Sequence, residues 1–298
     1  MQLTHFSDPG CPWAWSAGPA FATLHWRYGD QLTWRLVLIG LSETAAQYER
    51  RGYTGERQAK GYRNFRWRGM PFATEPRPRM HATWPMCRVV VAARRLYPAR
   101  EWEVFRALQF AQFTSTLQLD DPAGLEQALA WLDGIDARGL VAASREPETE
   151  ALFAADRALA RTAAGRPIEF QGRSATTPEG EVRYTAPSLV FTASDGSSLE
   201  AGGFQPVEAY DVLIANLDRS LTRREPATDV GELLDAFPAG LTTYEVAAVM
   251  APHLTPPDRD AAEDALISLA AEGGAERHAF GNDALWMSAL RHTSALAA

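Results

Sequence analysis

Cys11 is the residue whose place in the sequence points most directly to chemistry. It follows the turn formers Ser7-Asp8-Pro9-Gly10 and precedes Pro12, which suits the first position of a helix. At a helix N-terminus, free backbone N–H groups and the helix dipole stabilise a thiolate and lower the pKa of a thiol from about 8.5. Because the thiolate is the nucleophile, this position predicts a reactive cysteine. The alternative is a buried structural cysteine at a turn.

The second cysteine, Cys87, lies far from Cys11 in the sequence, among apolar neighbours in a helical segment. Two such cysteines make neither a disulfide framework nor a four-cysteine zinc site, and the six histidines show no ligand spacing. We therefore expect no metal and no bound cofactor. For Cys87 we expect a structural role, with a role as partner thiol to Cys11 as the alternative.

The elements around Cys11 read as strand, helix, strand, which is how a parallel α/β sheet begins. From about residue 43 to 165 the apolar spacing becomes helical, and no segment there reads convincingly as a strand. Strand-like runs return later around the hairpin turn Asp195-Gly196. The expected bounds are residues 2–6, 12–28 and 32–38 for the first unit, 189–191 and 198–201 for the hairpin, and 207–221 for a following helix.

Residues 225–298 carry 12 acidic and 3 basic side chains, whereas the rest of the chain is close to neutral. This change predicts two domains, at residues 1–224 and 226–298. Three short helical patterns and a possible hairpin around Gly281-Asn282-Asp283 make the second one similar to a winged-helix module. Its third helix carries Asp258, Asp260, Glu263 and Asp264 against Arg259, so DNA phosphates would repel it. We expect packing or protein interaction there.

The run from Phe6 to Trp15, FSDPGCPWAW, resembles the active-site segment of the DsbA-like thioredoxin family. That family includes cytosolic dithiol oxidoreductases, hydroxychromene-carboxylate isomerases and kappa-class glutathione transferases. The resemblance extends to Thr185-Ala186-Pro187-Ser188, which matches the cis-proline loop, and to residues 203–210, which match the last strand-to-helix step. It covers about residues 1–221. It implies an α/β, thioredoxin-like fold with a large helical insertion at about residues 43–175, followed by the winged-helix-like domain.

The resemblance also implies a site. Cys11 would be the catalytic nucleophile, and the substrate would be bound by Pro12, Trp13, Ala14, Ala186 and Pro187. Dithiol members have a second cysteine where this chain has Ala14, a residue that could be natural or engineered. Without that thiol Cys11 cannot complete an intramolecular disulfide cycle. We therefore expect a monothiol oxidoreductase, acting through a mixed disulfide or thiol conjugate that a glutathione-like, low-molecular-weight thiol resolves. The alternatives are a redox-inactive protein-binding module and a glutathione-type thiol-dependent isomerase or transferase.

Residues 50–106 carry 14 basic against 4 acidic side chains, and aromatic residues stand between the arginines. That pattern suggests nucleic acid, but a net charge of -8 and a pI of about 5.3 oppose it. We expect a solvated face that pairs with the acidic tail, or an anion site for an acidic thiol. With no apolar run of about 20 residues and no secretory signal, we expect no membrane partner and a cytoplasmic location. Partners would be a thiol or disulfide, as a small molecule or protein, and possibly a second copy of the chain.

Overall fold

The computed structural model describes residues 1–177, 179–280 and 283–290. Within these residues the chain forms two compact units, each with its own core. The first unit comprises Met1–Trp15, Thr33–Arg66 and Phe72–Phe204, and the second comprises Ser16–Leu32, Trp67–Pro71 and the described residues from Gln205 onwards. The second unit thus takes in segments that lie before residue 224, because helices from the N-terminal half pack on its own helices.

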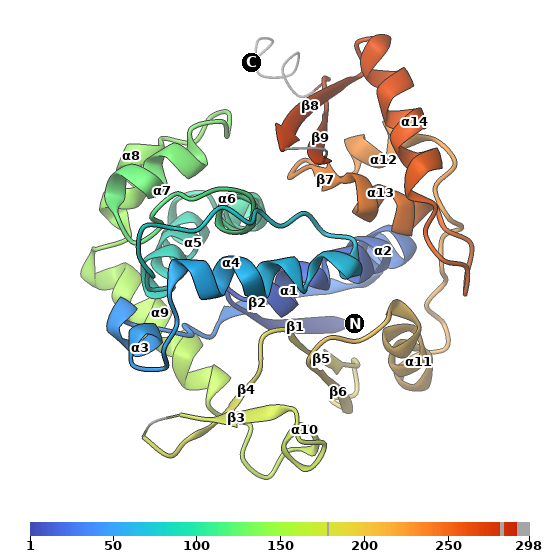
Figure 1. Cartoon of the computed structure of the whole chain (residues 1–298). Coiled ribbons are helices and arrows are strands. Elements are labelled where there is room, and N and C mark those ends of the chain that lie inside the picture. Colours follow the sequence, from blue (N-terminus) through green and yellow to red (C-terminus); the bar gives the residue numbers. More distant parts are fainter. Residues whose placement is uncertain (178, 281–282, 291–298) are drawn as a thin grey trace. The chain divides into compact units, whose positions relative to one another are not determined.

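A four-stranded sheet in the order β2-β1-β5-β6 lies in the first unit (Figure 1). Its strands are β1 (Gln2–Ser7), β2 (Thr33–Leu38), β5 (Ser188–Thr192) and β6 (Ser198–Gly202). β1 and β2 are parallel, while β5 is antiparallel to both β1 and β6. The expected strand pair and the β5–β6 hairpin are therefore present. The sheet brings β1, which leads to Cys11, beside β5, which follows Pro187.

Eight helices of the first unit lie between β2 and the short hairpin of β3 (Ser174–Thr176) and β4 (Val182–Tyr184). Prolines begin several of them, as suits a first turn whose N–H groups have no partner within the helix. The helices are α3 (Ala45–Glu49), α4 (Gly55–Arg63), α5 (Trp84–Leu96), α6 (Glu101–Thr114), α7 (Pro122–Leu129), α8 (Ala137–Ala143), α9 (Pro147–Ala160) and α10 (Pro167–Phe170). The helical insertion is thus observed, and β3 and β4 are strands that the sequence pattern did not reveal.

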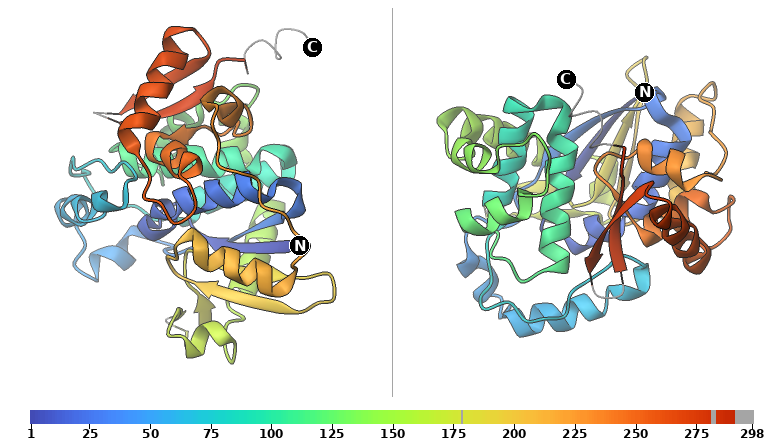
Figure 2. Two further views of the ribbon diagram at one scale, coloured as in Figure 1. Left: turned by 90° about the vertical axis from the view of Figure 1, so that its right-hand side faces the viewer. Right: turned by 90° about the horizontal axis from the view of Figure 1, so that it is seen from above.

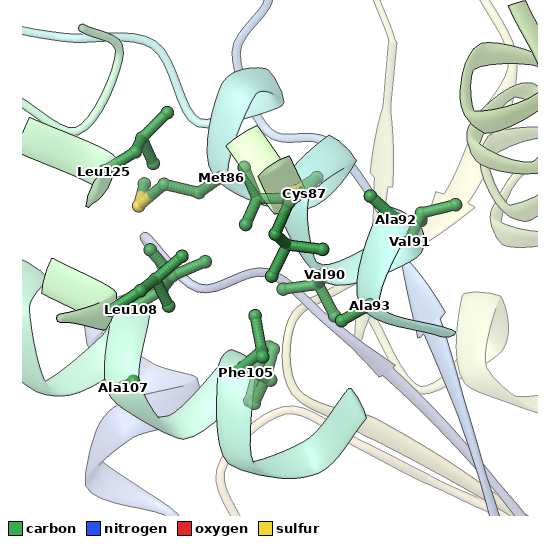
Figure 3. Close-up of a cluster of buried hydrophobic side chains, with 14 of the residues drawn as sticks. Met86, Cys87, Val90, Val91, Ala92, Ala93, Phe105, Ala107, Leu108 and Leu125 are labelled. Atoms are coloured by element: carbon green, nitrogen blue, oxygen red, sulfur yellow. The ribbon is translucent and has the colours of Figure 1, made fainter. Parts of the chain in front are cut away.

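The helices α5 to α9 share a core with β2. Residues of α5 such as Met86, Val90 and Ala93 are fully buried, and they face Phe105 and Leu108 of α6 (Figure 3). Figure 2 shows these helices gathered on one side of the strands in the view from above. Burial of this apolar surface stabilises the helical segment far more than helix propensity does. The insertion is therefore a packed body and can hold residues rigidly at the site.

The second unit contains α2 (Gly18–Tyr28), α11 (Val207–Leu217), α12 (Val230–Asp235), α13 (Thr243–Met250) and α14 (Arg259–Ala271). A three-stranded sheet in the order β7-β9-β8 completes it, from β7 (Leu241–Thr242), β8 (Ala275–Phe280) and β9 (Asp283–Ser288). The three helices and the hairpin strands expected in the tail are present, whereas the turn residues Gly281 and Asn282 lie outside the described residues. Short 3₁₀ turns occur at Gly29–Gln31, Arg66–Arg68 and Pro98–Arg100.

Candidate active site

Cys11 lies between β1 and the short helix α1 (Pro12–Ser16). Its backbone N–H donates to the Asp8 carbonyl at 3.1 Å, which closes the turn, and its carbonyl accepts from the Trp15 N–H at 3.0 Å. The sequence predicted one helix from residue 12 to 28, but the structure breaks it after Ser16. Pro19 has no N–H to continue the helical ladder, and α2 begins afresh at Gly18. The helix that follows Cys11 therefore has only five residues.

The loop before β5 faces the Cys11 sulfur. The Ala186–Pro187 peptide bond is cis, and Cys11 Sγ donates to the Ala186 carbonyl at 3.1 Å. The antiparallel register pairs Phe6 with Ser188, which brings the end of β1 and the start of β5 together. The Pro187 carbonyl in turn accepts from the Gly203 N–H at 2.8 Å, which ties the loop to the end of β6. Cys11 and the Ala186–Pro187 peptide, which are far apart in sequence, are thus neighbours in the structure.

The two residues that follow Pro12 have different environments. Ala14 is 3% exposed and packs in the same apolar cluster as Cys11, so its methyl group occupies a buried position. Trp13 is 42% exposed. The Trp13 ring meets Phe65 edge to face at 5.0 Å and lies 6.2 Å from Phe204. Trp13 therefore gives the site an exposed aromatic rim, next to a sulfur that is itself buried.

The pKa of Cys11 is raised because the thiol is buried. The sequence-based expectation that a helix N-terminus lowers this pKa is therefore wrong. The thiol is 5% exposed, and removal from water raises its pKa to about 12. The backbone N–H groups of Trp13 and Ala14 stabilise the thiolate, as expected at the start of a helix, but the loss of hydration on burial outweighs them. The Ala186 carbonyl also accepts the thiol hydrogen and so favours the neutral form. The resting Cys11 is a protonated thiol at neutral pH.

Asp8, the first residue of this turn, has a fully buried carboxyl group that sequence reasoning did not single out. One of its oxygens, Oδ1, accepts from the Gly10 N–H at 2.8 Å. The other, Oδ2, accepts from the Leu41 N–H at 2.7 Å and from the Thr83 hydroxyl at 2.9 Å. Burial raises the pKa of Asp8, and its charge raises the pKa of Cys11. Asp8 thus joins the ends of β1 and β2 to the start of α5.

Cys87 belongs to this buried network rather than to the exposed rim. Its sulfur donates to Asp8 Oδ2 at 3.5 Å, and its side chain is fully buried in α5. Burial and the charge of Asp8 raise the pKa of the Cys87 thiol well above its usual range. These contacts fit the structural role expected for Cys87.

Arg183 in β4 supplies positive charge near the sulfur. Its charge interacts with those of Cys11 and Asp8, and it lowers the pKa of Cys11. Two tyrosines of the helical segment, Tyr48 and Tyr62, have pKa values that burial raises and that the charge of a Cys11 thiolate would raise slightly further. None of the three could be found by sequence spacing, since each reaches the site through folding of the insertion or of the β3–β4 hairpin.

The arginine-rich segment does not form one solvated face. Arg77 is 5% exposed, and its guanidinium donates to the backbone carbonyls of Gln112 and Leu117. Arg79 is exposed and forms ion pairs with Asp120 and Asp121 of the same unit.

Within the described residues, no cluster of His, Cys, Asp or Glu side chains is arranged to hold a metal ion.

Several solved structures superpose on most of this chain. A probable DsbA oxidoreductase from Streptomyces coelicolor superposes with a TM-score of 0.55 at 17% identity, over 76% of this chain and 93% of that one. A proposed protein disulfide isomerase from Nitrosomonas europaea gives 0.54 at 20% identity, over 72% and 96%. The cytosolic disulfide reductase DsbM from Pseudomonas aeruginosa, also solved with GSH, gives 0.50 at 19% identity, over 73% and 98%. No protein-family model and no curated relative matches the chain.

These likenesses establish the fold. The chain has the α/β, thioredoxin-like fold of DsbA-type structures, with a helical insertion. The neighbours are matched over nearly their whole length, while about a quarter of this chain lies outside each match. Among the described residues, no helix combines the length and the apolar character needed to cross a bilayer.

Proposed function

We propose that the protein is a thiol oxidoreductase of monothiol type, in which Cys11 exchanges with disulfides of low-molecular-weight thiols. The observation that carries the proposal is the position of the Cys11 sulfur, 3.1 Å from the carbonyl of Ala186 in the loop that precedes β5. The neighbours of this fold include a protein named as a disulfide reductase and solved with GSH. A glutathione-like thiol is accordingly the co-substrate that we propose.

The exchange needs one protein sulfur, one small disulfide and one small thiol. Cys11 loses its proton and attacks a disulfide, so that a Cys11–S–S–R bond forms, the substrate S–S bond breaks, and one thiol leaves with a proton. A second small thiol then attacks the outer sulfur of the mixed disulfide, so that the bond to the Cys11 sulfur breaks, a disulfide of the two small thiols leaves, and Cys11 takes up a proton to become a thiol again. Because Ala14 occupies the place of a second cysteine, the protein has no thiol there to resolve the intermediate. Pro12, Trp13, Ala14, Ala186 and Pro187 would line the bound substrate.

A second candidate is a glutathione-type thiol-dependent isomerase or transferase. The observation that favours it is the buried, protonated state of Cys11, whose pKa burial raises to about 12. A neutral thiol is a poor nucleophile, but it can donate a hydrogen bond to the thiolate of a bound cofactor. In that reaction Cys11 would hold the cofactor sulfur and would never form a disulfide. A redox-inactive binding module would do neither.

Turnover with matched cysteine variants separates these functions. We expect the protein to catalyse reduction of bis(2-hydroxyethyl) disulfide by glutathione, Cys11→Ser to lose that activity, and Cys87→Ala to keep it. Equal rates for Cys11→Ser and the wild type would contradict the proposal. An inactive wild type whose melting temperature nevertheless rises with glutathione would favour the second candidate, and the absence of both effects would favour a binding module.

The remaining expectations concern the setting of this chemistry. We propose a cytoplasmic location, as for the neighbour named as cytosolic. For the segment at residues 226–298 we propose a winged-helix-like packing or protein-interaction module. Its helix α14 carries Asp260, Glu263 and Asp264, whose charge would repel nucleic acid. A homodimer stays a prediction of the sequence analysis.

A further inference from the structure

Three aromatic side chains of the first unit meet beside the active-site turn. The Trp13 ring contacts Phe65 edge to face, with 5.0 Å between centroids, and it lies 6.2 Å from the Phe204 ring. Phe65 follows α4, and Phe204 follows the end of β6. Both distances fall within the range of favourable aromatic pairs. These three side chains are called the aromatic rim below.

A closed series of contacts links the aromatic rim to the Cys11 sulfur. Cys11 Sγ donates to the Ala186 carbonyl at 3.1 Å, and the carbonyl of the proline that follows accepts from the Gly203 N–H at 2.8 Å. Gly203 directly precedes Phe204, whose ring lies beside Trp13, two residues after Cys11. One side of the rim therefore belongs to the segment that carries the sulfur, and the other to the segment that holds the facing loop.

The packing around Cys11 determines where a group attached to its sulfur can extend. Cys11 packs in an apolar cluster that includes Phe6, Ala14 and Val190, all of them buried. A close-packed interior has no room for an added group. On the solvent side, Trp13 is 42% exposed and is the one exposed residue of α1. The group that a disulfide leaves on Cys11 therefore extends towards the aromatic rim.

The rim presents apolar ring surface to such a group. Phe65 and Phe204 are half-buried, so part of each ring is open to solvent. The fully buried Phe72 packs behind Phe65, with 5.6 Å between centroids, and holds that ring in place. An aromatic group would gain both apolar burial and ring contacts on this surface, whereas the carboxylates of glutathione would lose hydration there. The chemistry of the rim therefore favours an aromatic group.

We propose that Trp13, Phe65 and Phe204 form a specificity subsite for an aryl or arylalkyl group on the sulfur that bonds to Cys11, so that the preferred substrates are disulfides of small aromatic thiols. The proposal rests on the exchange proposed above and names its substrate class. Cys11 bonds to the sulfur that carries the aromatic group, and the other half of the disulfide leaves as a thiol with the proton that Cys11 loses. Glutathione then attacks the outer sulfur, a glutathione–aryl disulfide leaves, and the glutathione proton restores the Cys11 thiol.

The test compares two alkylating reagents that differ by one aromatic group, iodoacetamide and N-benzyliodoacetamide, at pH 8.5. The quantity measured is the ratio of the benzyl to the plain rate at Cys11, with Cys87 counted separately by peptide mapping, divided by the same ratio for free glutathione. Because the same thiolate attacks both reagents, a change in the pKa of Cys11 cancels in this ratio. We expect a normalised ratio of about five, the size of effect that an aromatic contact produces.

Variants of the rim should remove this preference. Trp13→Ala should bring the normalised ratio close to one, Phe204→Ala should lower it by about half, and Trp13→Phe should keep most of it because a ring is restored. Phe170→Ala is the matched control and should behave as the wild type. Phe170 of α10 is 82% exposed and, in the part of the chain that the structure describes, makes no ring contact. Phe204→Ala decides the matter if Trp13→Ala fails to fold.

The readout needs no disulfide exchange, so the subsite and the proposed function can fail separately. A wild-type ratio no higher than that of free glutathione, or an unchanged ratio in the folded rim variants, would overturn the subsite even if Cys11-dependent turnover is observed. An aromatic preference that depends on Trp13 in a protein without turnover would support the subsite and reject disulfide exchange.

Discussion

Whether Cys11 carries a proton depends on burial and on two nearby charges of opposite sign. Burial raises the pKa of its thiol, Asp8 raises it further, and Arg183 lowers it. An oxidoreductase with such a site reacts through a small population of thiolate, so each neighbouring charge should change the reaction rate. Variants of Asp8 and Arg183 therefore measure how far each charge controls the reactivity of Cys11.

Replacing these two charges should have opposite effects. Asp8→Asn removes a negative charge, lowers the pKa of Cys11 and should speed its alkylation about threefold at pH 8, whereas Arg183→Gln should slow it by a similar factor. The measurement is the alkylation rate of Cys11 in each variant after circular dichroism has shown that it is folded. Asp195→Asn, in the exposed turn between β5 and β6, is the control. Effects of the same sign in both variants would refute this account.

Residue type and spacing located Cys11, but not the groups that control its ionisation. A cysteine before a proline-initiated helix is a local signal, whereas the role of Pro187 was inferred from the family resemblance, because a proline before a strand can simply begin that strand. The lowered pKa was predicted from the same local rule and is wrong, because burial is a property of the folded chain. Tyr62 and Arg183 come from distant elements, so no local pattern indicates them.

At the level of helices and strands, the elements with a clear hydrophobic periodicity in the sequence were predictable. The sheet, the β5–β6 hairpin and the main helices of the insertion follow from hydrophobic spacing. Short elements were missed. Helix α4 is polar on most of its surface, so its apolar face is too narrow to recognise in the sequence. Its N-cap is Thr54, whose side chain accepts from the Arg57 N–H. Yet α4 carries Tyr62, and the loop after it leads to Arg77.

Arg77 should be the arginine on which the position of these elements depends. Its buried guanidinium donates to carbonyls at and beyond the last turn of α6, where a positive charge also suits the helix dipole. Arg77→Met should lower the free energy of unfolding by about 2 kcal/mol, since charge-assisted bonds are lost and two carbonyls are left unpaired.

The same substitution two residues later is the control. Arg79 is exposed and its ion pairs with Asp120 and Asp121 should contribute less than about 1 kcal/mol, so Arg79→Met should be nearly neutral. Urea unfolding of both variants at pH 7 provides the comparison. Equal losses of unfolding free energy in Arg77→Met and Arg79→Met would show that Arg77 stabilises the fold no more than a surface arginine does.

At the scale of the whole molecule, each compact unit contains a histidine that its surroundings keep neutral, the buried His81 in the first unit and the half-buried His25 in the second. Burial lowers the pKa of His81 in the first unit and of His25 in the second to about 4, against an unfolded value near 6.5. The folded chain then binds fewer protons than the unfolded chain between pH 6.5 and 4. Stability that is complete above pH 6.5 is therefore lost progressively as the pH falls towards 4.

We expect this loss to amount to about 3 kcal/mol for each histidine. Urea unfolding at pH 7, 5.5 and 4 measures it, and His81→Gln and His25→Gln should each flatten the dependence of the free energy of unfolding on pH by about half. A free energy of unfolding that stays constant from pH 6.5 to 4 in the wild type would show that these histidines are not held neutral.

The division into units itself was not predictable from charge, because α2 precedes the insertion in sequence but packs with the C-terminal helices.

Intact-mass analysis after exposure to glutathione disulfide shows whether Cys11 forms a mixed disulfide with a small thiol. We expect one glutathione adduct per chain, mapped to Cys11, absent from Cys11→Ser, present in Cys87→Ala and removed by excess reduced glutathione. An unmodified wild-type protein, or an adduct that persists in Cys11→Ser, would contradict the proposed exchange at Cys11.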